Sequence, residues 1–309
     1  MKIILFFFAY CLLILSAEAQ VRTADADMRG LRASDFPRII QLAENVYAYE
    51  DLMGEIGTSF AFTTNSLFVV TSDGVLVADG QGSVEKTQRM IDEIATITEQ
   101  PIRYVVICAD HIDHVAGNSA FPESTIFLAH PNSKAEIERL SSRALIPVPM
   151  ETVSENHHIM LGDTEFQVQF LGRAHTGGDL IVYLPQTNIL FTGEIFFNRL
   201  YPSVGGNRSG RPTEWIQTLK RVESMNANIV VPGHGFVDAP DVLAEELVNF
   251  RHALENLVSE STRLHDTGIP SERASRSINL GEYQYWYRAV NNLPDAIDQV
   301  YRELDGGLE

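Results

Sequence analysis

Residues 108–118 read Cys-Ala-Asp-His-Ile-Asp-His-Val-Ala-Gly-Asn and directly follow a strand-like run of apolar residues. Two imidazoles and a carboxylate, from His111, Asp113 and His114, stand within four positions of this segment. Histidine nitrogens and carboxylate oxygens both bind zinc at about 2.0–2.2 Å. The composition of this loop therefore indicates a metal site, which needs further ligands from elsewhere in the chain.

Three later segments place further possible ligands in the same kind of position. His175 lies in Gly-Arg-Ala-His-Thr-Gly-Gly-Asp-Leu, Glu194 in Phe-Thr-Gly-Glu, and His234 in Val-Pro-Gly-His-Gly. Each segment follows a strand-like run, and its glycines let the backbone come close to a bound ion. Four such segments predict a metal centre that is built on loops at the ends of strands.

With these four segments the chain resembles the metallo-β-lactamase-fold hydrolases, roughly over residues 45–250. That family carries a His-x-His-x-Asp-His motif, a His-Thr-x-Gly-Asp segment, an Asp or Cys after Thr-Gly, and a final Pro-Gly-His-Gly. The chain departs from it twice, because Ala109 replaces the first histidine and Glu194 replaces the usual Asp or Cys. The resemblance implies an α/β fold, a four-layer αββα sandwich with the metal ligands at one edge.

The resemblance also implies how the ligands divide between two metal positions. The first position retains only His111 and His175, because Ala109 removes its third imidazole, and two imidazoles alone bind zinc weakly. The second position retains its full set, with Glu194 within reach. We therefore expect one zinc at the second position, or an unequal pair bridged by Glu194. The predicted metal ligands are His111, Asp113, His114, His175, Glu194 and His234.

Three residues beside the motif have alternative interpretations. Cys108 closes an apolar strand and is expected to be a buried, inert thiol, with a metal or redox role as the alternative. Asp110 occupies a variable position of the motif, but it could move in to replace the missing imidazole. Asp79, in Val-Ala-Asp-Gly, matches an acidic residue of the family that orients a ligand histidine, or else it only caps a turn.

The predicted function is that of a zinc-dependent hydrolase for a carbonyl substrate such as an ester, a lactone or a β-lactam. Zinc lowers the pKa of a bound water toward 7, so that the water can attack a carbonyl near neutral pH. Asp113 is predicted to orient this water, and His111 to act as a base or to help to orient it. The alternatives are a non-catalytic metal-binding protein and an iron-dependent redox enzyme, since a glutamate ligand also suits iron.

The N-terminus predicts export. Lys2 precedes an unbroken apolar run over residues 3–15, and Ala17-Glu18-Ala19 is a small-x-small cleavage pattern. Such a run is too short to span a bilayer and is typical of a secretory signal peptide. We predict a signal peptide over residues 1–19, a single domain with a C-terminal helical extension over residues 20–309, and a periplasmic or secreted protein.

Charge limits the partners that the chain can bind. It has 41 acidic and 23 basic residues and a net charge of −18, without a basic stripe. This composition disfavours nucleic acid and anionic membrane surfaces as partners. We expect a small-molecule substrate, and the composition does not predict an oligomeric state.

Apolar periodicity predicts a series of strands, helix, strands and helix that occurs twice, as in two β-α halves with packed sheets. Residues 20–44 are expected to be a lead-in with at most one short helix. Residues 53–57 occupy the place where relatives carry a flap over the substrate. The loop over residues 201–211 either places Arg208 or Arg211 on a substrate carboxylate or is a plain connection. The predicted strands are 46–49, 59–62, 66–70, 75–78, 104–107, 157–161, 164–171, 180–184, 189–192 and 229–231, and the main helices are 83–98, 213–225 and 239–264.

Overall fold

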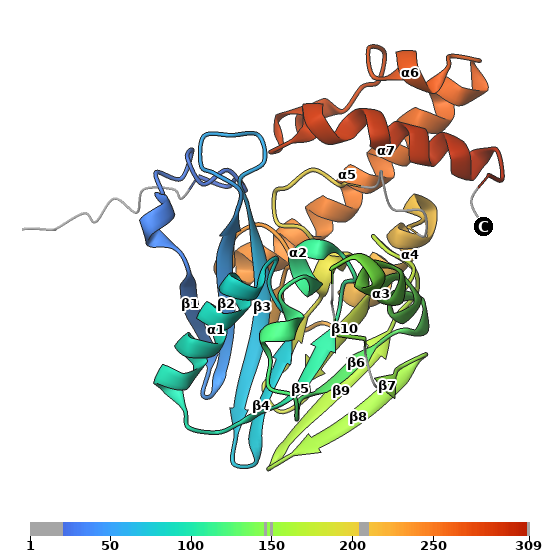
Figure 1. Cartoon of the computed structure of the whole chain (residues 1–309). Coiled ribbons are helices and arrows are strands. Elements are labelled where there is room, and N and C mark those ends of the chain that lie inside the picture. The colour runs from blue at the N-terminus through green and yellow to red at the C-terminus, as the bar shows by residue number, and fades with distance from the viewer. Residues whose placement is uncertain (1–20, 145–146, 149–150, 204–209, 308–309) are drawn as a thin grey trace, which may run out of the picture.

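The computed structural model describes residues 21–144, 147–148, 151–203 and 210–307. Two mixed β-sheets pack face to face and are flanked by helices (Figure 1). This arrangement confirms the predicted α/β class and the four-layer αββα sandwich. The predicted signal peptide, residues 1–19, lies outside the described residues.

The first sheet has seven strands, in the order β1-β2-β3-β4-β5-β6-β7. Its first four strands pair antiparallel, and β4 to β7 pair parallel. The strands are β1 (Arg38–Ala43), β2 (Val46–Met53), β3 (Phe62–Thr71), β4 (Gly74–Ala78), β5 (Ile102–Ile107), β6 (Ile126–Ala129) and β7 (Glu151–Thr152).

The second sheet has five strands, in the order β12-β11-β10-β9-β8. Only β11 and β12 are parallel; the other neighbours are antiparallel. The strands are β8 (Asn156–Leu161), β9 (Thr164–Phe170), β10 (Leu180–Leu184), β11 (Ile189–Phe191) and β12 (Ile229–Val231).

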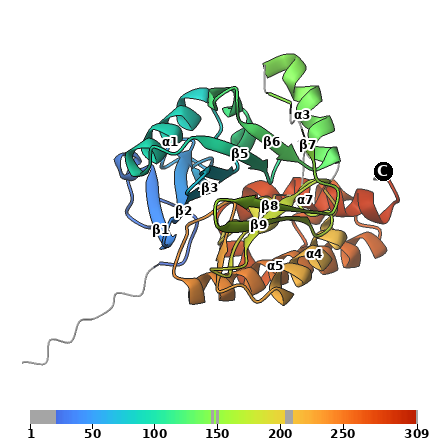
Figure 2. The ribbon, with the colours of Figure 1, turned by 90° about the horizontal axis from the view of Figure 1, so that it is seen from below.

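Helices cover the outer faces of both sheets. Seen from below, α1 and α3 lie over the first sheet, while α4 and α5 lie beyond the second (Figure 2). The α-helices are α1 (Val84–Ile97), α2 (Ile112–Val115), α3 (Pro131–Ala144), α4 (Pro212–Ser224), α5 (Pro240–Asp266), α6 (Ser271–Ala274) and α7 (Ala289–Leu304), and the 3-10 helices are η1 (Ala33–Asp35), η2 (Asn118–Ala120), η3 (Gly193–Ile195) and η4 (Gly281–Tyr285).

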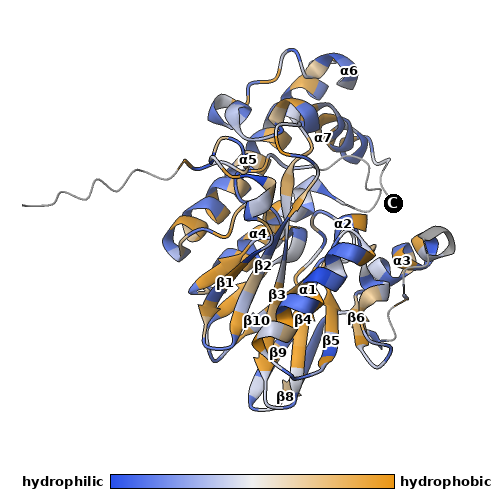
Figure 3. Ribbon diagram, turned by 60° about the vertical axis from the view of Figure 1, so that its left-hand side comes forward, coloured by the Kyte–Doolittle hydropathy of each residue, from blue (hydrophilic) through white to orange (hydrophobic). Residues whose placement is uncertain are grey.

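The strands of the first sheet are apolar on both faces, because each face is covered. Along β4, Val75 and Val77 pack with the core under α1, whereas Leu76 and Ala78 face the core between the sheets. This follows from the period of two along a strand. Figure 3 shows hydrophobic residues along β4 and β5 and a hydrophilic outer side on α1. Because the strands are buried on both faces, the loops that follow β4 and β5 start from fixed positions.

Two sequence predictions are corrected near the N-terminus. Residues 20–44 contain the strand β1 in addition to the short helix η1; its residues are mostly half-buried, so they lack an apolar signal. The predicted strands 59–62 and 66–70 are wrong as separate elements. Residues 59–61 lie in a loop, and the strand β3 runs without a break from Phe62 to Thr71.

The C-terminal residues form helices on the outer side of the second sheet. The long helix α5 packs against α4, β12 and α7, and its buried residues include Leu243, Leu247, Phe250, Leu254 and Leu257. These are the five residues whose spacing predicts the amphipathic helix. Within the described part of the chain, no helix has the length and hydrophobicity needed to cross a membrane.

Candidate metal centre

The six predicted ligands meet at one edge of the sandwich, on loops that follow strands. His111 follows β5, and it precedes α2, the short helix that carries Asp113 and His114. Glu194 lies in η3 directly after β11, and His234 lies just after β12. The carboxyl ends of neighbouring parallel strands meet at the same edge of a sheet, which brings these loops together.

Four side chains form one cluster: Asp113, His114, Glu194 and His234. The Nε2 atoms of His114 and His234 are 3.4 Å apart, and the Oδ2 atom of Asp113 lies 3.5 Å from His234 Nε2 and 3.7 Å from His114 Nε2. The Oε1 atom of Glu194 is 3.0 Å from His234 Nε2 and 3.9 Å from His114 Nε2. Ligands about 2.0–2.1 Å from a tetrahedral ion are separated by about 3.4 Å. The four atoms therefore fit a zinc-sized cation.

The other ring nitrogens of this cluster fix the orientation of its histidines. His234 Nδ1 donates a hydrogen bond to the carbonyl oxygen of Thr63, at 2.7 Å. His114 Nδ1 lies 3.1 Å from Asp79 Oδ2. When both rings are neutral, each carries its proton on Nδ1, so the Nε2 lone pairs of His114 and His234 face each other. Such an arrangement is repulsive unless a cation or a proton lies between the two nitrogens, and it is the usual pattern for metal-binding histidines.

Asp79 links the ends of β4 and β5 to this cluster. Its Oδ1 atom accepts hydrogen bonds from the backbone N–H groups of Cys108, at 2.7 Å, and Ala109, at 3.3 Å. Its backbone has a φ of 61°, in the left-handed region that few residues other than glycine adopt. Asp79 is fully buried. Asp79 therefore orients His114 with one carboxylate oxygen and binds the backbone after β5 with the other. Its role is not limited to capping a turn.

The second cluster consists of His111, His175 and Glu194. The Nδ1 atom of His111 lies 3.0 Å from His175 Nε2 and 2.9 Å from Glu194 Oε2. The Oε1 atom of Glu194, which already faces His234, is 3.3 Å from His175 Nε2. Glu194 is thus shared by both clusters, and its two carboxylate oxygens are placed between them.

The charges of the centre shift the pKa values of its groups. Burial lowers the pKa of His111, but the adjacent Glu194 carboxylate outweighs it and raises this pKa to about 10. In His114 the same balance, with Asp79 as the main partner, raises the pKa to about 9. Burial raises the pKa of Glu194, but His111 and His175 outweigh it and hold this pKa well below its usual range. In the metal-free protein, protons on His111 and His114 offset the negative charge of the adjacent carboxylates, whereas burial lowers the pKa of His175.

Among the described residues, the two clusters are exposed to solvent on the side of His111 and Asp113. The side chain of His111 is 31% exposed and that of Asp113 is 16% exposed. The side chains of His114, His175, Glu194 and His234 are each at most 4% exposed. A substrate must therefore approach from the side of His111 and Asp113.

The neighbours of the motif lie outside both clusters. Cys108 and Ala109 are fully buried, and burial raises the pKa of the Cys108 thiol well above its usual value. Asp110 is buried too, and burial raises its pKa to about 6. Within the described residues neither Cys108 nor Asp110 joins a group that could hold a metal. Of the candidates to replace the imidazole missing at position 109, only Glu194 is in place.

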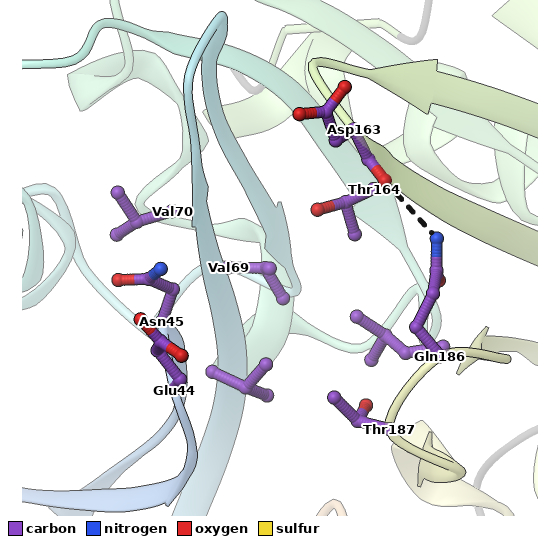
Figure 4. A pocket seen from close by; sticks show the side chains of 10 residues that line it. Glu44, Asn45, Val69, Val70, Asp163, Thr164, Gln186 and Thr187 are labelled. Carbon is purple, nitrogen blue, oxygen red and sulfur yellow. Dashed lines mark hydrogen bonds between the residues drawn. The ribbon is translucent and has the colours of Figure 1, made fainter.

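The two arginines predicted to bind a substrate carboxylate remain predictions. Arg208 lies outside the described residues. Arg211 precedes α4, and its Nε atom lies 3.5 Å from Glu214 Oε1. A cavity of about 170 Å³ between the sheets, lined by Asn45, Val69 and Gln186 among others, lies at the opposite end of the strands (Figure 4). It is too far from the ligands to belong to the same site.

Comparison with known proteins decides the family. The Metallo-beta-lactamase superfamily model matches residues 60–234, which include all six candidate ligands. The chain belongs to the metallo-beta-lactamase superfamily. Membership and the candidate metal centre together suggest a metal-dependent hydrolase.

Several superfamily members are similar to this chain in sequence or in structure. The metallo-beta-lactamase type 2 of Bacillus sp. (strain 170) is 26% identical over 211 residues, which cover 68% of this chain and 80% of the relative. The one from Bacteroides fragilis is 25% identical over 76% of this chain and 91% of its own length. The metallo-beta-lactamase from Pontibacter korlensis superposes with a TM-score of 0.60 at 21% identity, covering 70% of this chain and 99% of that one.

A larger enzyme shares the fold over more of this chain. The sec-alkylsulfatase Pisa1 from Pseudomonas sp. superposes with a TM-score of 0.67 at 14% identity. The alignment covers 86% of this chain and 50% of the sulfatase. At this identity the match shows the fold alone.

Sequence reasoning missed several residues around the centre. Thr63 acts through its backbone carbonyl, so its side chain gives no signal, and the Thr64 hydroxyl donates to Asp113 Oδ2 at 3.3 Å. Arg288 lies far beyond the last motif, and the negative charge of Asp113 acts on it. The spacing of histidines and acids identifies ligands, but it carries no information about groups that support them from other elements.

Proposed function

We propose that this chain is an exported zinc-dependent hydrolase acting on a carbonyl group of a small-molecule ester, lactone or β-lactam. The supporting observation is the pair of clusters that share Glu194. The relatives named metallo-beta-lactamases support hydrolysis, and the apolar N-terminal run with its small-x-small ending supports export.

The two clusters differ in the number of ligands that they offer. Asp113, His114, Glu194 and His234 would offer a cation four ligands, whereas His111, His175 and Glu194 would offer three. Structural zinc sites have four protein ligands, and catalytic ones have three. We propose a tighter four-ligand site and a weaker three-ligand site that depends on Glu194. Zinc bound there would lower the pKa of a bound water toward neutral and would polarise a carbonyl oxygen.

His111 and Asp113 have the catalytic roles in this proposal. They are the ligands with the most exposed side chains, so a substrate meets them first. The hydroxyl of Thr64 restrains Asp113 by donating to its Oδ2 atom at 3.3 Å, so this carboxylate is held ready to orient a water. His111 lies beside Glu194 at the solvent side, and while the weaker site holds no metal its imidazole can take up and release a proton there.

The first test measures the metals bound per chain in the mature protein by elemental mass spectrometry, together with hydrolysis of a panel of p-nitrophenyl esters, lactones and a chromogenic cephalosporin. We expect zinc, at one to two ions per chain, and EDTA-sensitive hydrolysis of at least one substrate class. Glu194→Gln should lower both the zinc content and the rate, the rate by about 100-fold, because it removes a charged ligand from both clusters.

Glu123→Gln is the matched control, because Glu123 is exposed on a loop outside both clusters. It should leave the zinc content and the rate unchanged. Bound iron with redox activity would replace the proposal by the redox alternative. Bound zinc without hydrolysis across the panel would support a non-catalytic metal-binding protein instead.

A further inference from the structure

Arg288 lies in the C-terminal extension, outside the residues 60–234 that match the superfamily. It immediately precedes α7 and has a φ of 61° and a ψ of 14°, a left-handed conformation that is unfavourable for a residue with a Cβ atom. Backbone strain of this kind is found mostly at functional sites, where the surrounding structure holds it in place.

The segment that carries Arg288 is anchored at the rim of the metal centre on two sides. The Tyr287 hydroxyl donates to the carbonyl oxygen of Thr58 at 3.0 Å, and the Tyr287 carbonyl accepts from the N–H of Tyr201 at 2.9 Å. Thr58 belongs to the loop before β3, and Tyr201 to the loop after Glu194. Arg288 is therefore held where these two loops meet.

The guanidinium of Arg288 lies beside the ligands. Its central carbon is 5.0 Å from the ring centroid of Phe60 and 5.4 Å from that of Phe62. The Phe62 ring in turn contacts the ring of the ligand His234, with centroids 5.0 Å apart. The two aromatic rings contact the cation by their faces, and the side chain remains half-buried at the edge of the centre.

Unlike Arg199 and Arg211, Arg288 forms no ion pair with a carboxylate of the residues that the structure describes. Arg199 pairs with Glu246 at 2.7 Å and Arg211 with Glu214 at 3.5 Å. Arg288 is half-buried, and among the described residues its Nε atom is buried without a hydrogen-bond partner. Burial lowers the pKa of this group, while the negative charge of Asp113 opposes that shift. A buried donor without an acceptor is unfavourable unless a ligand satisfies it.

We propose that Arg288 determines specificity by binding a carboxylate group of the substrate while the substrate's carbonyl group faces the metal centre. The N–H groups of a guanidinium match the geometry of a carboxylate, and the two phenylalanine rings orient them. This inference rests on the proposed function, because it assumes a metal-bound substrate. It narrows the substrate class to carbonyl compounds that also carry a carboxylate.

The test uses binding and does not need the natural substrate. Thiolates bind zinc directly, so mercaptoacetate, 3-mercaptopropionate and 4-mercaptobutyrate each place a carboxylate at a different distance from the metal. Their primary amides have the same size and no charge. Calorimetry on the zinc-loaded protein compares the affinity of each acid with that of its amide. For at least one chain length we expect the acid to bind about tenfold more tightly, the size of a charge-assisted hydrogen bond.

Three variants separate the role of Arg288 from general charge effects. Arg288→Met should remove the preference for the acid, and Arg288→Lys should keep part of it. Arg302→Met removes an exposed arginine from the same helix and should leave the preference unchanged. Zinc content and melting temperature, measured for every variant, identify any variant that is misfolded or lacks metal.

The outcomes distinguish this inference from the proposed function. Equal binding of acids and amides to the wild type, or an unchanged preference in Arg288→Met, overturns the role of Arg288 and leaves the hydrolase proposal standing. A preference that depends on Arg288, in a protein that hydrolyses nothing, supports the anion site and counts against the hydrolase. No thiol binding in a protein without zinc overturns both.

Discussion

At the scale of single residues, Glu194 accounts for the departure from the family motif at position 109. The missing imidazole leaves His111 and His175 as an incomplete site, and the two oxygens of Glu194 lie 2.9 Å and 3.3 Å from these rings. Its Oε1 atom also reaches His234 at 3.0 Å. A glutamate is one methylene longer than the aspartate usual at this position, and here a single carboxylate contacts both clusters.

Asp79→Asn tests the group that orients His114. Asparagine keeps an oxygen for the N–H groups of Cys108 and Ala109, but it no longer presents a carboxylate to His114 Nδ1. We expect the zinc affinity to fall by about 10- to 100-fold, as for other residues that orient ligands. Competition with a zinc-binding dye measures the change. Asp73→Asn, in the exposed β3–β4 turn, is the control. An unchanged zinc affinity in Asp79→Asn would show that Asp79 has only a structural role in the backbone.

Proton release on zinc binding tests the charges of the centre. The pKa of His111 is raised to about 10 and that of His114 to about 9, so both carry a proton in the metal-free protein at pH 7.5. Zinc binds only the deprotonated rings. Binding should therefore release about two protons at full occupancy, and the zinc affinity should increase with pH until both rings are deprotonated, at about pH 10. Calorimetry in buffers of different ionisation enthalpy counts the protons, and a heat that does not depend on the buffer contradicts the assignment.

At the scale of elements, strands provide the support and loops carry the ligands. The ends of β5, β11 and β12 are fixed by burial in the core, which positions their loops at one edge. The loop between β2 and β3 is different, because Phe60 is 52% exposed and residues 55–60 are mostly exposed. The C-terminal extension holds this loop through the hydrogen bond from Tyr287 to Thr58.

Tyr287→Phe tests whether the hydrogen bond from Tyr287 to Thr58 restrains the β2–β3 loop. The change removes one hydrogen bond, worth about 1 kcal/mol. We expect amide hydrogen exchange over residues 54–61 to become about fivefold faster, because local opening of the loop becomes more favourable. Mass spectrometry of exchanged peptides measures it. Tyr285→Phe removes the hydroxyl of an exposed tyrosine in the same segment and should change nothing. Equal exchange in the Tyr287 variant would show that the loop is held in another way.

At the scale of the whole molecule, the metal centre joins the two sheets. His111, Asp113 and His114 follow a strand of the first sheet, whereas His175, Glu194 and His234 follow strands of the second. Without metal, two carboxylates and four imidazoles converge at one edge, and protons on His111 and His114 offset part of the negative charge. A bound cation replaces those protons and favours the folded chain, since the unfolded chain has no such site.

Removal of metal should therefore lower the thermal stability of the protein. A ligand present at about 100 times its dissociation constant stabilises the folded state by about 2.7 kcal/mol. For a chain of this size we expect the melting temperature to fall by about 5–10 °C after dialysis against EDTA. Differential scanning calorimetry measures the fall, and added zinc should reverse it. Identical melting curves with and without EDTA would show that no tightly bound metal links the sheets.

The amino-acid sequence, through its apolar periodicity and its resemblance to the family motifs, predicts the αββα sandwich and the six residues that converge at its edge. Apolar runs with a period of two predict strands wherever one or both faces are buried, and the four motif segments lie directly after such runs. The edge strand β1 was missed because its half-buried residues have no such pattern. The loop before β3 was mistaken for a strand because its aromatic residues resemble one.

Only the tertiary structure decided how these residues are shared and supported. That Glu194 contacts both clusters, that the Thr63 carbonyl orients His234, and that Arg288 lies beside Phe62 all depend on how the sheets and the C-terminal helices pack. These contacts join residues that are distant in the chain, and local patterns do not encode such pairs. Ligand types can be predicted from composition and spacing because the chemistry of a metal dictates them. Their geometry follows from the packing of the whole core.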